Sequence, residues 1–337
     1  MTTNRFPLFR LPFLALCKVL YFYGPHEIIQ LSLCSKQGLQ VTKKCWKKRG
    51  SVEAYLYVKE TPNVEPYFVD SGVYYHYYKF VVSKAVDLQE QQVHNVRVGD
   101  AVVPSSIHKD TEIVTFWKNK NTGIEGIVRY IKDLFDDPIT SVDLKSEDYK
   151  NEFIDTMDFI MKTQESIEEC TLHNESLTDK CLTYLLDSCK ITEELRIYGG
   201  PTRQFRNDWN IRLNYLHISN GSCITLQNLM NIDCRSLNIL KSSLTSEDIN
   251  QFLKHWQNGG NLRIRYARIE INSIDQEAIT SGIESVSQPE TLRRCYRVRN
   301  HTVINYGGLD IKRNDGTTGT IYISGNTFGL GVDPIGG

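Results

Sequence analysis

Basic and aromatic side chains recur on short predicted strands in the second half of the chain, and their types are suited to recognising an anion. The set that we expect to share one surface is Arg196, Tyr215, His217, Lys241, Arg263 and Arg265. An arginine can hold a carboxylate or a phosphate through two parallel hydrogen bonds, and Tyr and Arg commonly anchor protein interfaces. These residues therefore predict a binding patch for an acidic or phosphorylated protein segment, and a solvated strand face is the alternative.

No pattern typical of an enzyme accompanies this patch. The sequence contains no GxxxxGK[ST], GxSxG or HExxH motif and no zinc-finger spacing. His173 and His217 lie on predicted strands near Cys170 and Cys223, but nothing in the sequence places a nucleophile beside an imidazole. We therefore expect a non-catalytic protein that needs neither a cofactor nor a metal ion.

A repeat of short strands and helices is predicted to position the patch. Strands are expected at 139–144, 167–172, 193–198, 213–218, 237–242 and 262–267, and helices at 150–163, 177–189, 224–231 and 246–257. Apolar anchors recur on these strands at Val142, Cys170, Leu195, Leu216, Leu240 and Ile264, spaced by 21 to 28 residues. This period is typical of leucine-rich repeats, in which strands line a concave face. A coincidental alternation of strands and helices is the alternative.

The first 135 residues have a different character. Residues 6–46 are apolar with helical periodicity, and Pro12 and Pro25 suit the first turns of short helices. Residues 50–130 are rich in Val and Tyr with partial alternation, which predicts strands, and a closing amphipathic helix follows at 123–137. Such a small helical head cannot bury much apolar surface alone, so it needs a partner or a packed neighbour.

Together these patterns predict a mixed α+β or α/β fold in four segments. Residues 1–49 are expected to form a small three-helix domain and residues 50–135 a β-rich connecting region. Residues 136–300 are expected to form an irregular, leucine-rich-repeat-like strand–helix stack, and residues 301–337 a C-terminal hairpin, signalled by Asn314-Asp315-Gly316, with a tail.

Cysteine usage and charge bear on the cell compartment. The nine cysteines form no CxxC pair, which favours reduced thiols over a disulfide framework. The continuous apolar run at 11–17 is too short to span a bilayer. The formal net charge is −1, but residues 1–50 carry nine Lys and Arg against one acid. We expect a cytoplasmic or nuclear protein, and the basic run at 43–49 is compatible with nuclear import.

The N-terminal segment resembles the F-box of nematode-type F-box proteins. The matching residues are Phe6-Pro7-Leu8, Arg10-Leu11-Pro12, Val19-Leu20, Pro25, Glu27-Ile28-Ile29 and the run from Leu31 to Lys36. Residues 135–320 are similar to the type 2 F-box-associated domain of the same proteins. The stretches that carry this second resemblance are LNYLHISNG, LTSEDINQFLKHWQNGGN and GGLDIKRNDGTTGTI.

The resemblance implies a substrate receptor of an SCF-type ubiquitin ligase. Its F-box would bind a Skp-type adaptor and through it a cullin scaffold, and the rest of the chain would bind a protein substrate. The residues expected at the adaptor interface are Leu11, Pro12, Leu16, Ile28, Leu31 and Cys34. Packing within the chain's own core is the alternative role for each of them.

Two other functions remain open from the sequence. A leucine-rich scaffold would bind a partner without any role in ubiquitination. Single-stranded nucleic-acid binding is suggested by Tyr74-Tyr75, Tyr77-Tyr78 and the arginines of residues 262–268, because aromatic rings can stack on bases. The pI of about 6.7 argues against nucleic acid as a partner.

Overall fold

The structure is a computed structural model of the chain, and it describes residues 8–46, 51–70, 73–76, 78–87, 93–108, 111–145, 150–173 and 178–333. The chain divides into two compact units. The first unit comprises residues 1–143 and 158–164, and the second comprises residues 144–157 and 165–337. β8 (Ile139–Lys145) and α5 (Lys150–Thr163) extend across this division.

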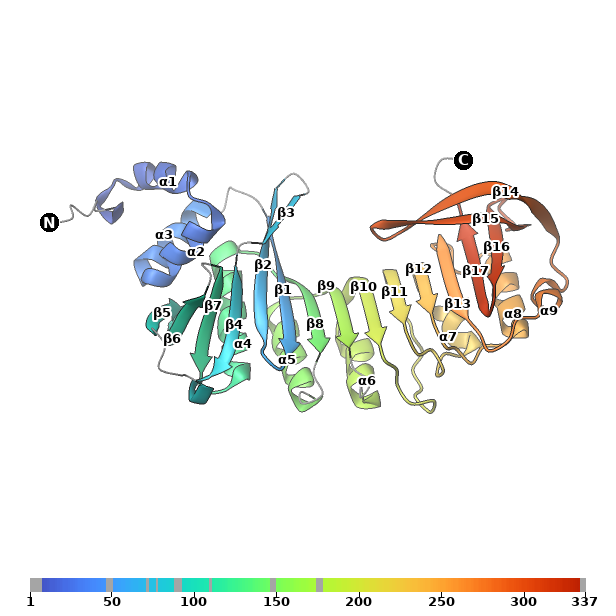
Figure 1. Cartoon of the computed structure of the whole chain (residues 1–337), viewed down its shortest axis with the longest axis horizontal. Coiled ribbons are helices and arrows are strands. Elements are labelled where there is room, and N and C mark those ends of the chain that lie inside the picture. The colour runs from blue at the N-terminus through green and yellow to red at the C-terminus, as the bar shows by residue number, and fades with distance from the viewer. Residues whose placement is uncertain are drawn as a thin grey trace. The chain divides into compact units, whose positions relative to one another are not determined.

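The first unit starts with helices and continues with strands (Figure 1). Its elements are η1 (Leu8–Arg10), α1 (Phe13–Tyr21), α2 (Pro25–Cys34), α3 (Lys36–Trp46), β1 (Ser51–Lys59), β2 (Asn63–Asp70), β3 (Val73–His76), β4 (Lys79–Lys84), η2 (Ala85–Asp87), β5 (His94–Val98), β6 (Ala101–His108), β7 (Glu112–Trp117) and α4 (Lys120–Phe135).

The strands of the first unit form a mixed sheet. β2 pairs antiparallel with β1, β3 and β4, β4 pairs parallel with β7, and β6 pairs antiparallel with both β5 and β7. Helix α4 covers this sheet with buried residues at helical spacing, among them Ile124, Ile127 and Ile131. Gly123 permits the close approach, because a Cβ there would lie 2.3 Å from Cγ1 of Val82 on β4.

Helices α1–α3 are packed into the first unit rather than standing apart from it. The Trp46 ring at the end of α3 contacts Phe68 of β2 and Phe135 of α4, with ring centroids 5.4 and 5.2 Å away. The Ser32 hydroxyl of α2 is hydrogen-bonded to the Tyr130 hydroxyl of α4, and a Cys17–Cys45 disulfide links α1 to α3. The apolar faces of α2 and α3 therefore have partners within the chain.

The second unit combines a parallel and an antiparallel part. Its elements are β9 (Ile167–His173), α6 (Asp179–Ser188), β10 (Ile191–Tyr198), β11 (Arg212–Ile218), α7 (Leu226–Asn231), β12 (Asp233–Ile239), α8 (Ser246–Gln257), β13 (Tyr266–Glu270), α9 (Gln276–Thr280), β14 (Ser285–Val298), β15 (His301–Lys312), β16 (Thr318–Ser324) and β17 (Thr327–Val332).

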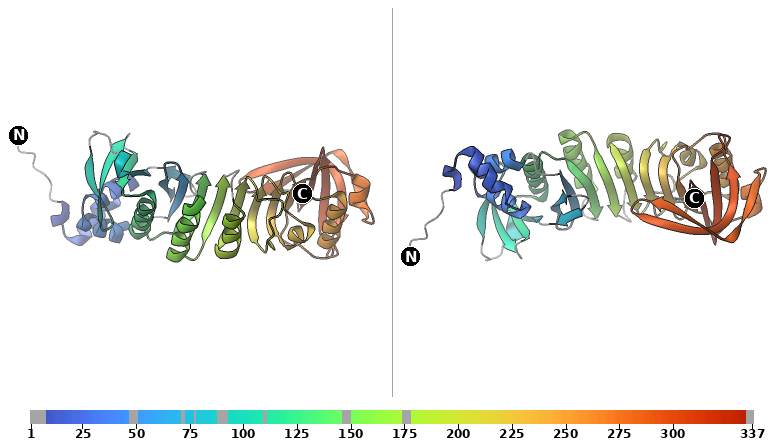
Figure 2. Two further views of the ribbon diagram at one scale, coloured as in Figure 1. Left: turned by 90° about the horizontal axis from the view of Figure 1, so that it is seen from below. Right: turned by 90° about the horizontal axis from the view of Figure 1, so that it is seen from above.

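Its strands β9 to β13 lie side by side and pair parallel in sequence order. The sheet then continues antiparallel through β17, β16, β15 and β14. Helices α6, α7 and α8 lie along one face of the parallel strands, and the long β14–β15 hairpin crosses the other face (Figure 2). This arrangement leaves a polar strand face partly covered by a hairpin.

The fold predicted from the sequence was wrong. A three-helix F-box followed by a leucine-rich-repeat-like stack is not what the structure shows, because the N-terminal helices pack onto a sheet of strands and the second unit consists mostly of strands. The N-terminal helices share a core with the β1–β7 sheet and α4. The parallel strands are not a uniform repeat stack, since no helix separates β10 from β11 and the sheet ends in long antiparallel strands. The division at residues 49, 135 and 300 stays a prediction.

Several expected elements lie close to their predicted positions, including β9, β10, β11 and the hairpin between β15 and β16. Others differ: β12 begins and ends earlier than predicted, and β13 starts at Tyr266 rather than at residue 262. Tyr77, residues 47–49 of the basic run and residues 334–337 of the tail lie outside the described residues, as do the side chains of Tyr74 and Tyr75. No described helix is both long enough and apolar enough to cross a membrane.

Candidate functional site

Polar side chains of the parallel strands align in rows on the face that the hairpin crosses. Strand register places Glu169, Glu194, Tyr215 and Ser236 in a first row. A second row contains Thr171, Arg196, His217, Asn238 and Arg268. Alternate residues of a strand point to opposite faces, and the residues between the rows, such as Leu195 and Leu216, are buried.

The first row holds an ionic cluster that fastens the hairpin to the strand face. Arg299, at the tip of the β14–β15 hairpin, forms ion pairs with Glu194 at 2.5 Å and with Glu169 at 3.3 Å. Glu194, whose side chain is 11% exposed, also pairs with Arg196, and Arg196 lies 3.5 Å from Glu169. Although burial opposes it, hydrogen bonding and attraction to Glu194 and Glu169 raise the pKa of Arg299. Two arginines thus face two carboxylates, so the cluster carries almost no net charge.

The backbone at the hairpin tip is unusual. Val298 and His301 are Cα partners, so Arg299 and Asn300 make a two-residue turn. Arg299 has φ of +58°, a conformation that glycine normally supplies in such turns. Holding a side chain there costs roughly 1 kcal/mol or more, and the ion pairs with Glu194 and Glu169 offset that cost.

Tyr296 provides the second attachment of the hairpin. Its buried ring lies 5.7 Å from the Tyr266 ring, and its hydroxyl is 2.8 Å from that of Tyr322. The ring lies directly over Gly331 of β17, where a Cβ would be 2.3 Å from Tyr296 Cζ. Any residue larger than glycine at position 331 would push the hairpin away from the sheet.

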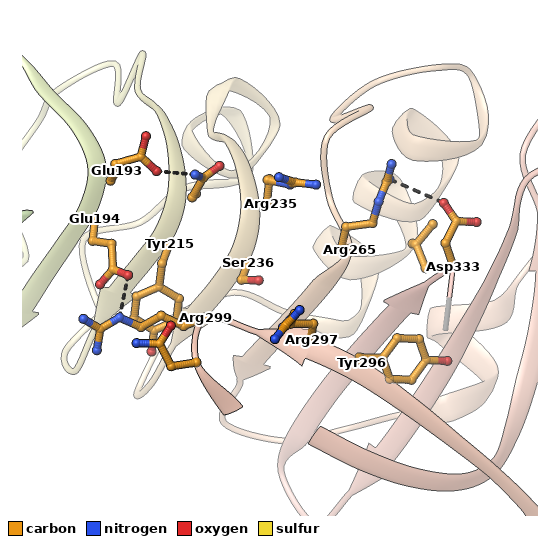
Figure 3. Close-up of a pocket in the computed structure, with 13 residues that line it drawn as sticks. Glu193, Glu194, Tyr215, Arg235, Ser236, Arg265, Tyr296, Arg297, Arg299 and Asp333 are labelled. Atoms are coloured by element: carbon orange, nitrogen blue, oxygen red, sulfur yellow. Dashed lines mark hydrogen bonds and ion pairs between the residues drawn. The ribbon is translucent and has the colours of Figure 1, made fainter. Parts of the chain in front are cut away.

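A cavity of about 520 Å³ lies between the hairpin and the strands (Figure 3). It is lined by Glu193, Glu194, Asn214, Tyr215, Arg235, Ser236, Arg265, Tyr296, Arg297, Arg299, Asn300, Val332 and Asp333. The first strand row and the hairpin supply most of this wall, and Figure 3 shows their side chains turned toward one another. We call this space the hairpin cavity.

Aromatic rings of β9, β10 and β11 meet beyond the hairpin cavity. The Tyr198 ring lies 4.8 Å from His173 and 4.9 Å from His217. With the Asn238 amide nitrogen 2.9 Å from Nδ1 of His217, that ring nitrogen accepts a hydrogen bond. Burial, with Arg196 and Arg268 nearby, lowers the pKa of His217, so the neutral imidazole is favoured. Burial likewise raises the pKa of Tyr215.

A second cavity of about 540 Å³ lies at the other ends of the strands. Its lining includes Arg203, Lys241, Ser242, Glu270 and Asn326. Lys241 has φ of +49°, and its backbone N–H donates to the Glu270 carboxylate at 3.2 Å. Among the described residues, no cluster of His, Cys, Asp or Glu is arranged to hold a metal ion in either place.

The structure brings together four of the six predicted patch residues. Tyr215 and Arg265 line the hairpin cavity, Arg196 lies in its ionic cluster, and His217 is in the adjacent row. Arg263 precedes β13 and donates to the Asn214 side chain at 3.0 Å. Lys241 lines the second cavity instead. Whether any of these residues bind a substrate stays a prediction.

Four arginines in or beside the hairpin cavity were left out of the predicted patch: Arg235, Arg268, Arg297 and Arg299. Arg235 and Arg268 were missed because they lie just outside the predicted strands at 237–242 and 262–267, while β12 and β13 include them. A signal for the other two does exist in the sequence, since residues 291–308 contain four arginines and no acid. That run is the basic hairpin that covers the cavity.

The first unit has a separate exposed apolar surface at α1. Phe13, Leu14, Tyr21 and Phe22 are 51%, 79%, 63% and 85% exposed. Leu14 and Tyr21 are seven residues apart, so they lie on one side of the helix, and Phe22 is its C-cap residue. Clustered exposed apolar side chains of this size are typical of surfaces that bind a partner. We call these four residues the α1 surface.

The residues predicted at the adaptor interface are distributed differently. Leu16 and Ile28 are buried, 4% and 1% exposed, and pack within the first unit. Leu11 and Leu31 are partly exposed, and Pro12 and Cys34 are exposed. Pro12 is next to the α1 surface in sequence, because it is the N-cap residue of α1. Their contact with an adaptor stays a prediction.

Known proteins resemble the chain in the region of the hairpin cavity and along its length. Residues 204–269, which include β11, α7, β12, α8 and most of β13, match the family model described as F-box associated. The chain is 21% identical to the Skn-1 dependent zygotic transcript 15 protein of Caenorhabditis elegans, over 97% of this chain and 96% of that protein.

A second relative from Caenorhabditis elegans, uncharacterized protein F59B2.8, is also 21% identical, over 94% of this chain and 74% of its own length. No solved structure matches the chain. Part of the second unit is therefore similar to F-box-associated proteins, and the chain as a whole is similar to two proteins of Caenorhabditis elegans.

Proposed function

We propose that the chain is a substrate receptor of an SCF-type ubiquitin ligase, in which the second unit binds a protein substrate. The observation that carries this proposal is the position of the F-box-associated match. Residues 204–269 supply Asn214, Tyr215, Arg235, Ser236 and Arg265, which form the strand wall of the hairpin cavity. The segment that matches the F-box-associated model therefore also supplies five of the thirteen residues that line the cavity.

The proposed adaptor-binding element is residues 8–46, and its contact surface is the α1 surface. A Skp-type adaptor would cover Leu14, Tyr21 and Phe22, which are each more than 60% exposed. Burying a side chain of this size contributes about 1.5–3 kcal/mol, so a few of them suffice for a specific interface. Through the adaptor the receptor would join a cullin scaffold. The proposal assigns the chain no catalytic step and no cofactor.

Co-expression of the full chain with a nematode Skp-type adaptor tests the proposal. A stable complex of chain and adaptor that also retains a cullin is the expected result. A folded chain that leaves the adaptor unbound would contradict it.

That second outcome would favour a protein-interaction scaffold without a role in ubiquitination. One observation supports this alternative: Leu16 and Ile28, expected at the adaptor interface, are buried in the chain's own core. The scaffold would keep the hairpin cavity as its binding site but would need a different partner for the α1 surface.

A further inference from the structure

Three arginines from separate segments surround the hairpin cavity. Arg235 belongs to β12, Arg265 directly precedes β13, and Arg297 belongs to β14 in the overlying hairpin. The backbone N–H of Arg265 donates to the carbonyl oxygen of Arg235 at 2.7 Å, so these two residues are neighbours on adjacent segments. Two like charges that share one wall repel each other, and an anion between them would relieve that repulsion.

The carboxylates of the cavity already have partners. Glu194 pairs with Arg196 and Arg299, Glu193 accepts a hydrogen bond from the Asn214 amide, and Asp333 lies 3.6 Å from Arg265. In the part of the chain that the structure describes, no ion pair involves Arg235 or Arg297. Figure 3 shows both side chains at the cavity without a dashed contact.

The charge surplus indicates what the cavity can bind. Its lining contains four arginines against three acids, and the two unpaired guanidinium groups approach from the strand floor and from the hairpin. A phosphomonoester carries about −1.5 to −2 charge and three acceptor oxygens, which matches two guanidinium groups better than a single carboxylate does. Guanidinium groups bind phosphate through paired hydrogen bonds.

The size and the remaining lining indicate what carries the phosphate. The volume of about 520 Å³ exceeds that of a phosphate group. Partly buried Tyr215 adds apolar contact area and exposed Asn300 adds a polar group able to bind a peptide backbone, whereas Tyr296, Val332 and Ser236 are buried behind them. A phosphorylated side chain with its flanking residues would use both parts of this wall.

We propose that the hairpin cavity binds a phosphorylated side chain of an extended protein segment, with Arg235 and Arg297 holding the phosphate and Arg265 assisting. This inference rests on the proposed function, since it names the substrate class of the same site. The proposed site differs from the patch predicted from sequence, because Arg196 is paired with Glu194 in the ionic cluster and Lys241 lines the second cavity.

The test uses the full chain and three degenerate peptide libraries that differ only at a fixed central position, which is phosphoserine, glutamate or serine. Fluorescence anisotropy would measure binding to the wild type, to the double variant Arg235→Gln, Arg297→Gln and to Arg203→Gln. Arg203 is exposed and lines the second cavity, so its substitution removes an arginine charge away from the hairpin cavity. Circular dichroism would verify that each variant is folded.

We expect the phosphoserine library to bind the wild type most tightly, and the double variant to lose affinity for it by about tenfold or more, equivalent to 1.4 kcal/mol per tenfold. Arg203→Gln should bind like the wild type. Equal binding of the phosphoserine and serine libraries, or unchanged binding by the double variant, would overturn the inference. The affinities for inorganic phosphate and adenosine monophosphate provide a further comparison.

If either compound binds as tightly as the phosphopeptides, the cavity binds a small phosphate compound and the peptide assignment is wrong.

Adaptor binding separates this inference from the proposed function. A chain that binds the Skp-type adaptor but does not prefer phosphoserine would refute the phosphate site alone. Preference for phosphoserine without adaptor binding would support the phosphate site and leave the receptor role contradicted.

Discussion

Arg299 should hold the β14–β15 hairpin closed over its cavity. Two substitutions separate the stabilisation by its ion pairs from the cost of its backbone conformation. Arg299→Ala removes the ion pairs with Glu194 and Glu169 but keeps a side chain at φ of +58°. Losing hydrogen bonds between charged groups that are partly buried costs about 1.5–3 kcal/mol. Arg299→Gly removes the same ion pairs and also relieves the backbone by about 1 kcal/mol. The glycine variant should therefore be the more stable of the two.

Hydrogen–deuterium exchange of residues 291–308 measures the effect locally, which suits a chain with two compact units. With 1.4 kcal/mol corresponding to tenfold, Arg299→Ala should speed exchange at the hairpin tip by about tenfold to a hundredfold. Arg299→Gly should exchange about fivefold more slowly than Arg299→Ala. Arg203→Ala serves as the control and should exchange like the wild type. Wild-type exchange in Arg299→Ala, or equal exchange in both variants, would refute the reasoning.

Three further predictions concern packing and charge in the two units. Gly331→Ala should destabilise the second unit by about 1–3 kcal/mol in urea denaturation, because its Cβ would enter the Tyr296 ring, and an unchanged midpoint would contradict the close approach. Because folding lowers the pKa of His217, the unfolded chain binds a proton at this histidine before the folded chain does as pH falls below about 6.5. The free energy of unfolding is therefore highest above that pH and decreases below it. In His217→Asn the free energy of unfolding should decrease less between about pH 7.5 and 5.5 than in the wild type, and an equal decrease in both proteins would refute this. Gly123→Ala should destabilise the first unit by about 1–3 kcal/mol in thermal unfolding, because α4 cannot move away from Val82 without opening the core.

Local patterns predicted individual elements better than they predicted the arrangement. The buried spacing of α4 and the alternation in β10 and β11 are visible in the sequence, because each depends on neighbouring residues. The fold class was wrong because it depends on contacts distant in sequence. The packing of Trp46 against Phe68 and Phe135, and the crossing of the hairpin over the strands, leave no periodic signal.

The candidate site was predicted in part for the same reason. On β10 and β11 the register was right, so Arg196, Tyr215 and His217 face the side expected. On β12 the leucine pattern predicted the register one residue off. In the structure Ile239 is buried, and Ser236 and Asn238 lie on the strand face that the hairpin crosses. A slip of one residue moves every side chain of a strand to the opposite face. The predicted strand at 237–242 also lies later than β12, so Lys241 falls beyond the end of β12 and Arg235 was left outside the prediction.

The exposed α1 surface lies in the segment that was predicted to contact an adaptor, but its side chains differ from the predicted set, and adaptor binding itself stays a prediction. Leu16 and Ile28 looked like contact residues because they are apolar, and apolar type alone does not separate a core residue from an exposed one. The structure makes that separation, since Leu14 and Phe22 are exposed where Leu16 and Ile28 are buried.

Calorimetric titration of the full chain with a nematode Skp-type adaptor is the most direct test of the proposed receptor role. The wild type would be compared with the double variant Leu14→Glu, Phe22→Glu and with Val86→Glu, Val102→Glu. All four side chains are more than half exposed, and the control pair lies outside α1, at η2 and β6. We predict that the wild type and the control pair bind alike, and that the α1 pair loses affinity by about a hundredfold or more. Absence of binding by the folded wild type, or equal binding by the α1 pair, would contradict a receptor that docks through α1.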